Sequence, residues 1–228
     1  LRRETFGGVW ILCRQCHRAK GSQMWVPSYA TSEDKELIRE YTLGLPPSEL
    51  PPDTEVWEIR ADQFEVNETM TDHYQCWAQD VPFESSKLIK RIEVDLDETR
   101  VLHHIVLYRD TNLRHEGSFR CAGIPSDSDF LYAWAPGQDA IQFETGGLLS
   151  HPGERLIMQI HYNNAAGIPD VTDDSAVRIY HGEQDGTAYG MFVPGPTIGI
   201  LVSPESDQTV TGVCRISEEI TLLAGMPH

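Results

Sequence analysis

Three histidines in apolar segments carry the clearest chemical signal in the chain. His103 and His104 open the segment VLHHIVLY (101–108), and His161 lies in LIMQIHYNN (156–164). Neutral imidazoles bind Cu, Zn, Ni or Fe, and the residue types alone do not choose among these metals. No water-activating carboxylate motif lies nearby, which favours redox cycling over hydrolysis. The alternative is a set of unrelated core or surface histidines.

The adjacency of His103 and His104 is a geometric problem for any shared site. Both lie in a segment that reads as a β-strand, and neighbouring side chains of a strand point to opposite faces of the sheet. If both histidines bind one ion, the backbone must bend, or the ion must lie beside a strand edge or a β-bulge.

A second motif near the start of the chain could carry a cofactor. Cys13, Cys16 and His17 form CRQCH, the attachment pattern of haem c, in which the histidine is an axial ligand. The segment up to the next predicted element is shorter than a haem-wrapping domain usually requires, and Met24 is too close to reach the opposite haem face. The alternatives are a local disulfide or a chance occurrence of the motif.

The elements around these residues change character along the chain. Residues 33–43 predict a short helix, and the proline-rich segment 44–53 predicts a stiff linker. After it, short runs rich in Val, Ile, Tyr and Phe alternate with Gly, Pro, Asp and Asn. The fold class that we expect is all-β, an antiparallel jelly-roll β-sandwich preceded by a short helical N-terminal segment.

Composition excludes some classes of partner. The 18 Lys and Arg residues against 35 Asp and Glu residues give a net charge of −17, which repels nucleic acid. No apolar run reaches the roughly 18–20 residues of a membrane span. The chain begins with Leu1, so we expect it to be cut from a longer precursor. Its five cysteines fit an oxidising compartment, which predicts a secreted, extracellular or periplasmic protein.

Four segments, taken together and in order, resemble a known family. They are DHYQCW (72–77), VLHHIVLY (101–108), FLYAWAPG (130–137) and LIMQIHYNN (156–164). Their order and spacing are similar to those of the copper type II, ascorbate-dependent monooxygenases, the peptidylglycine-hydroxylating and dopamine β-hydroxylating enzymes. The resemblance covers roughly residues 60 to 228.

The resemblance implies a first copper site and its surroundings. In that family two jelly-roll sandwiches each carry one copper, and the residues matching the first site are His103, His104 and His161. This copper stores and delivers an electron, and its paired histidines bind through Nδ1. Tyr74 and Gln159 match positions that could orient ligands by hydrogen bonds. The alternatives are a packed strand aromatic and an ordinary polar residue.

The resemblance also implies one disulfide and excludes other histidines. Cys76 and Cys121 match a family disulfide, with two buried free thiols as the alternative. Four histidines that match no copper ligand of the family should not join the cluster: His73, His115, His151 and His181.

The family's second, oxygen-activating copper falls at the end of the chain. We expect an N-terminal segment 1–55, a first copper sandwich 56–188, and the opening strands of a second sandwich at 189–228. His228 matches the first ligand of the second copper, and Cys214 matches a half-cystine with a downstream partner. The second histidine and the methionine ligand are absent, so this chain alone should bind one copper without hydroxylating.

Three functions therefore stand as hypotheses. The first is the electron-transfer half of a copper monooxygenase, whose partners are a small-molecule substrate, a reductant such as ascorbate, and the missing second copper domain. The second is a non-enzymatic copper-binding or electron-transfer module with one three-histidine site. The third is a jelly-roll interaction domain whose histidines are structural.

Overall fold

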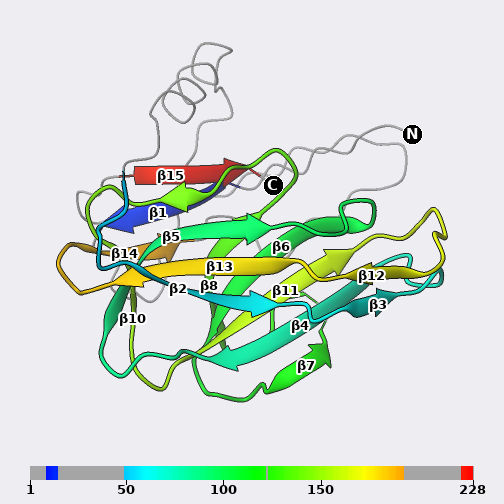
Figure 1. The fold of residues 1–228 in the computed structure, drawn as a ribbon, viewed down its shortest axis with the longest axis horizontal. Helices are drawn as coiled ribbons and strands as arrows, with labels where there is room; N and C mark the ends of the chain where they lie inside the picture. The colour runs from blue at the N-terminus through cyan, green and yellow to red at the C-terminus, as the bar shows by residue number, and fades with distance from the viewer. Residues whose placement is uncertain (1–8, 15–48, 122, 193–221, 228) are drawn as a thin grey trace, which may run out of the picture. The chain divides into compact units, whose positions relative to one another are not determined.

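The computed structural model describes residues 9–14, 49–121, 123–192 and 222–227 (Figure 1). Every regular element in these ranges is a β-strand, which confirms the predicted all-β class for the described part of the chain. The predicted helix at 33–43 lies outside the described residues, and the jelly-roll topology stays a prediction. The chain divides into two compact units, one of residues 50–188 and one of residues 1–49 with 189–228.

The larger unit is an open, sandwich-like pair of antiparallel sheets (Figure 1). The first sheet has the order β10-β5-β13-β2, with β9 on β5, and the second has the order β7-β4-β11-β6-β8. Strands β12 and β3 form a separate two-stranded sheet. The bounds are β2 Glu55–Arg60, β3 Phe64–Val66, β4 His73–Asp80, β5 Lys87–Asp95, β6 Leu102–Asp110, β7 Gly117–Arg120, β8 Ser128–Trp134, β9 Ile141–Gln142, β10 Gly147–Ser150, β11 Arg155–Tyr162, β12 Val171–Asp173 and β13 Ala176–Gly182.

Strand β11 lies at the centre of the five-stranded sheet, between β4 and β6. Its side chains from Leu156 to Tyr162 are all buried, and most of β6 is buried as well. Both strands are rich in branched aliphatic residues, which pack well on a pleated surface. The two histidine segments of the sequence therefore form neighbouring central strands.

An aromatic cluster fills one face of this sheet at the end where β11 finishes. The Phe64 ring stacks on Tyr162 with centroids 5.4 Å apart, and it meets Trp77 edge-on at 5.6 Å. These contacts anchor the short strand β3 over β4 and β11. They fix the last residues of β11, which include His161.

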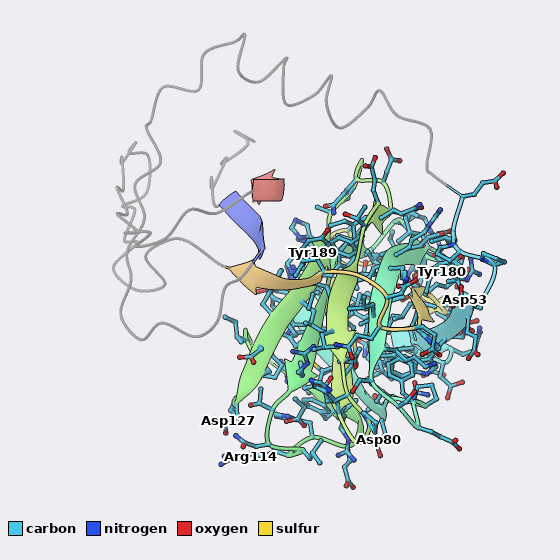
Figure 2. All side chains as sticks on the ribbon, turned by 90° about the vertical axis from the view of Figure 1, so that its left-hand side faces the viewer. Asp53, Asp80, Arg114, Asp127, Tyr180 and Tyr189 are labelled. Atoms are coloured by element: carbon cyan, nitrogen blue, oxygen red, sulfur yellow. A yellow bond between two sulfur atoms is a disulfide. The ribbon has the colours of Figure 1, made fainter. Side chains whose placement is uncertain are left out.

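Ion pairs gather at the other end of the same sheet. Arg155 begins β11 and contacts Asp80 at the end of β4 at 2.6 Å, while Arg114 contacts Asp127 at 2.8 Å. Figure 2 shows Asp80, Arg114 and Asp127 together at this end of the sandwich. Because β11 runs from Arg155 to Tyr162, the histidines lie at the opposite end.

The smaller unit contains strands from both ends of the chain. Strand β1 (Val9–Arg14) pairs antiparallel with both β14 (Ala188–Phe192) and β15 (Leu222–Pro227). The N-terminal segment and the C-terminal segment, which we expected to form separate parts, thus contribute strands to one sheet. Residues 193–221, the middle of the expected second sandwich, lie outside the described residues.

Candidate metal centre

A β-bulge in β6 solves the geometric problem of the adjacent histidines. His161 of β11 is paired with His104, but the next residue, Tyr162, is paired with Leu102. His103 is therefore the extra residue of a bulge, opposite no residue of its own. A bulge breaks the strict alternation of faces and re-aims a side chain. The bulge thus lets two neighbouring imidazoles turn toward one point.

The three imidazole rings form a compact triangle. The ring centroids of His103 and His104 are 5.2 Å apart, and each lies 4.8 Å from the centroid of His161. The ring planes meet at 61° to 65°, so no two rings are stacked on each other. One ligand nitrogen from each ring lies within 4.8 Å of the other two. Among the described residues this is the one such group of histidine, cysteine and carboxylate side chains.

The atoms that face each other in the pair are the Nδ1 nitrogens. The distance between His103 Nδ1 and His104 Nδ1 is 3.0 Å. Two nitrogens at this separation, each about 2.0 Å from one ion, subtend an angle of about 97° at the ion, between square-planar and tetrahedral values. With no ion bound, the same distance fits a hydrogen bond between one protonated and one bare nitrogen.

The third histidine has a polar atom that the described part of the chain leaves without a partner. His161 Nδ1 is buried and has no hydrogen-bond partner among the described residues. Its other ring nitrogen, Nε2, lies 2.5 Å from Asp72 Oδ1. A buried polar atom without a partner is uncommon and expensive. A metal ion at the centre of the triangle would satisfy it, so the residues present fit a bound ion.

The site favours the neutral form of His103. Partial removal of the ring from water is the main cause that lowers the pKa of His103, and the neighbouring His161 lowers it further, while Asp72 acts in the opposite direction. A neutral imidazole is the form that binds a metal. The surroundings therefore keep His103 ready for coordination at neutral pH. His103 is exposed and His104 is half-buried, so the cluster has access to solvent.

Tyr74 packs directly against one of the three rings. It is paired with His161 across β4 and β11, and the two rings stack with centroids 4.1 Å apart and planes 3° from parallel. The contact is a ring stack rather than the expected hydrogen bond. Burial, followed by the charge of Asp72, raises the pKa of Tyr74. Tyr74 is therefore uncharged, and its ring holds the His161 ring parallel to it.

Gln159 lies on the same side of β11 as His161 but binds elsewhere. Its Nε2 donates to the carbonyl of Gly123 at 2.6 Å and lies 3.3 Å from Cys121 Sγ. Its Oε1 accepts from the hydroxyl of Tyr108 at 3.5 Å. These contacts tie Gln159 to the segment after β7. These contacts join β11 to its neighbours next to the cluster, and none of them is with a histidine nitrogen.

The disulfide implied by the resemblance is present. Cys76 and Cys121 are joined, with their Cα atoms 5.9 Å apart. The backbone N–H of Cys121 also donates to the carbonyl of Tyr74 at 3.1 Å. The disulfide therefore fastens the segment after β7 to β4, next to the residue that stacks on His161.

Backbone hydrogen bonds join the three segments from which the site is built. Asn163 N–H donates to the Val101 carbonyl at 2.7 Å, and Asn164 N–H donates to the Met70 carbonyl at 3.1 Å. The exit from β11 is thereby fixed to the entrance of β6 and to the segment before β4. Tyr162 adds a buried bond from its hydroxyl to Asp173, at 2.7 Å.

The other described histidines stay apart from the cluster and have different partners. His73 stacks on Phe64, and the Nδ1 of His151 lies 2.8 Å from the hydroxyl of Ser86. The histidines in this group are His73, His115, His151 and His181. Cys16, His17, Cys214 and His228 lie outside the described residues, and Cys13 lies within β1. The predicted haem attachment and second copper ligand are therefore untested.

Asp72 is the functional candidate that the sequence analysis missed. It directly precedes β4, two residues before Tyr74. Alternation along an extended segment would place Asp72 and Tyr74 on one face. That signal becomes useful only once the register is known, because the register is what brings β4 beside His161.

Comparisons with known proteins add no family assignment. No protein-family model matches the chain, and no curated protein matches it significantly. The resemblance to copper monooxygenases thus depends on the four segments. Three of these segments contribute to the site as strands β4, β6 and β11.

Proposed function

We propose that this chain is the electron-transfer half of a copper-dependent monooxygenase. His103, His104 and His161 would hold one copper, where electrons from a small reductant such as ascorbate would enter. The C–H bond would be hydroxylated with O2 at a second copper centre. The observation that carries the proposal is the bulge in β6, which turns two adjacent imidazoles toward a third on the next strand.

Copper is favoured by the donor set together with the resemblance. Three imidazoles bind several transition metals, and they support both Cu(I) and Cu(II). When bound, copper supplies one-electron redox chemistry. The buried Nδ1 of His161, which has no hydrogen-bond partner among the described residues, and the facing Nδ1 atoms of the pair supply three nitrogen donors for it.

The protein's own residues hold these nitrogens in place before any ion arrives. The bulge sets His103 and His104, the Tyr74 ring fixes the plane of His161, and Asp72 binds its outer nitrogen. A site whose ligands are held by packing and by a supporting shell of hydrogen bonds moves little when it is loaded. Ligands held in this way suit a metal centre that gains and loses one electron without exchanging its ligands.

The environment of the protein is part of the proposal. A disulfide persists in oxidising compartments, so we infer a secreted, extracellular or periplasmic location. Among the described residues, no helix is both long and apolar enough to span a membrane. The partners in this proposal are a small-molecule substrate and a second copper domain. The Cys13–His17 motif stays a predicted haem c attachment site, which a haem-specific absorbance spectrum of the purified chain tests.

The second candidate function uses the same site without catalysis. A single three-histidine group in the described residues equally suits a copper-binding electron carrier. The two functions differ in whether a second copper site exists. A His and a Met that complete such a site with His228 would favour the monooxygenase.

Copper loading of the purified chain tests the proposal. After dialysis against Cu(II), we expect about one copper per chain, with an electron paramagnetic resonance signal that ascorbate abolishes. No hydroxylated product should accompany the oxidation of ascorbate. Absence of tightly bound copper would refute both copper functions, and coupled hydroxylation by this chain alone would show that the catalytic centre is misplaced.

A further inference from the structure

Asp72 makes a close contact with the outer nitrogen of a proposed copper ligand. Its Oδ1 lies 2.5 Å from His161 Nε2, while the carboxylate itself is 72% exposed and the His161 side chain is only 10% exposed. The carboxylate accepts, so the nitrogen must donate. The contact joins the solvent side of the site to its buried ring.

This contact determines which nitrogen of His161 is free. A neutral imidazole carries one N–H, and a proton on Nε2 leaves Nδ1 with a bare lone pair. Nδ1 is the buried atom that has no partner among the described residues. The two observations are independent, and both assign Nδ1 as the atom that faces the centre of the cluster.

The charge of Asp72 also reaches the other residues of the site. It raises the pKa of Tyr74, after the larger effect of burial, and it opposes the lowering of the pKa of His103. One carboxylate thus acts on the stacked ring and on a second proposed ligand. A negative charge so placed stabilises a doubly charged ion more than a singly charged one.

We propose that Asp72 is a positioning residue with two roles. It holds His161 in the Nε2-protonated tautomer, and its negative charge favours Cu(II) over Cu(I), which lowers the reduction potential of the site. The second role rests on the proposed copper function, whereas the first concerns the metal-free protein. Carboxylates that bind the outer nitrogen of a ligating histidine are known to raise ligand basicity.

Two substitutions separate the roles. Asp72→Asn keeps an oxygen acceptor for Nε2–H but removes the charge. Asp72→Ala removes both. Because Asp72 is mostly exposed, both variants should fold. Glu68→Gln is the matched control. Glu68 is exposed in the same segment before β4, and this substitution removes one negative charge, as Asp72→Asn does.

The first measurement is made without metal. Nitrogen-15 NMR of the His161 ring should show Nε2 protonated in the wild type, in Asp72→Asn and in Glu68→Gln. In Asp72→Ala the ring should shift toward a mixture of tautomers. A wild-type ring protonated on Nδ1, or an Asp72→Ala ring identical to the wild type, would overturn the tautomer role.

The second measurement uses copper. In Asp72→Ala, Cu(II) binding measured by chelator competition should weaken about 10–100-fold, and Cu(I) binding should weaken less. The potential should then rise by about 59 mV for each tenfold difference between the two losses. Asp72→Asn should raise the potential with the tautomer unchanged.

The outcomes distinguish the role of Asp72 from the proposed copper function on which its second part rests. If the wild type binds copper and both Asp72 variants behave like Glu68→Gln, the inference fails and the copper function stands. If the wild type binds no copper, the copper function and the charge role fail together, and the tautomer measurement alone decides the positioning role.

Discussion

His103 Nδ1 lies 3.0 Å from His104 Nδ1, although the two residues are neighbours in one strand. In a regular strand their side chains would leave opposite faces of the sheet. The register shift opposite His161 makes His103 a bulged residue and removes that obstacle. The site therefore depends on the register in which β6 and β11 are paired.

Removing the third imidazole should abolish tight copper binding. His161→Ala deletes the ligand whose Nδ1 is buried and has no partner in the described part of the chain, and the remaining pair cannot complete a three-nitrogen site. We expect at least a 100-fold loss of Cu(II) affinity, measured by chelator competition. His151→Ala is the control, because His151 is exposed and bonds Ser86. Equal losses in the two variants would contradict the site.

The stacked ring of Tyr74 should matter more than its hydroxyl. Tyr74→Phe keeps the 4.1 Å stack on His161 and should bind copper like the wild type. Tyr74→Ala loses a contact of about 0.5–1.5 kcal/mol, which corresponds to up to about tenfold weaker binding. Titration of both variants with Cu(II) makes the comparison. A loss in Tyr74→Phe as large as in Tyr74→Ala would transfer the role to the hydroxyl.

The disulfide should stabilise the larger unit. It closes a separation of 45 residues between Cys76 and Cys121, and removing a native disulfide typically costs about 2–5 kcal/mol. We expect the double variant Cys76→Ala, Cys121→Ala to lose that much free energy of unfolding in urea. Its copper affinity should also fall, because Cys121 is bonded to the backbone of Tyr74. A change in unfolding free energy below about 1 kcal/mol would contradict this account.

His181 should make the metal-free protein less stable in mild acid. Burial is the main cause that lowers its pKa; Lys87 lowers it further and Glu55 opposes both. The unfolded chain therefore takes up a proton at His181 at higher pH than the folded chain does. The associated stability is fully present above the unfolded pKa of about 6.5 and is lost as pH falls toward the folded pKa.

The variant His181→Leu isolates this contribution. In this variant an apolar leucine side chain replaces the His181 ring, whose centroid lies 4.4 Å from that of Phe83. Urea unfolding between about pH 7.5 and pH 5 should then show a shallower loss of stability than in the wild type. An unchanged slope in His181→Leu would rule out His181 as the titrating group.

The sequence predicts the all-β class because runs such as 101–108 and 156–164 carry the residues that strands prefer. It also singles out the three histidines by their residue type and apolar surroundings, while their joint role as ligands and the Cys76–Cys121 pairing come only from the resemblance. The register is not readable from local pattern, because pairing depends on residues far apart in the chain. For that reason the sequence could name a bulge as one of several possible solutions without placing it, and it could not find Asp72.

The role of Gln159 shows the same limit. Its position two residues before His161 correctly places it on the same face of β11. Its amide nonetheless turns to Gly123 and Cys121, because the disulfide brings their segment against that face. A spacing of two fixes the face of a strand, while the choice of partner belongs to the tertiary packing.

X-ray absorption of the copper-loaded chain tests the central claim most directly. The account predicts about one copper per chain, bound by three imidazole nitrogens at about 2.0 Å with no sulfur ligand, and losing one imidazole in each of the variants His103→Ala, His104→Ala and His161→Ala. Copper that is bound with sulfur, or with the same number of imidazoles in His161→Ala as in the wild type, would contradict it.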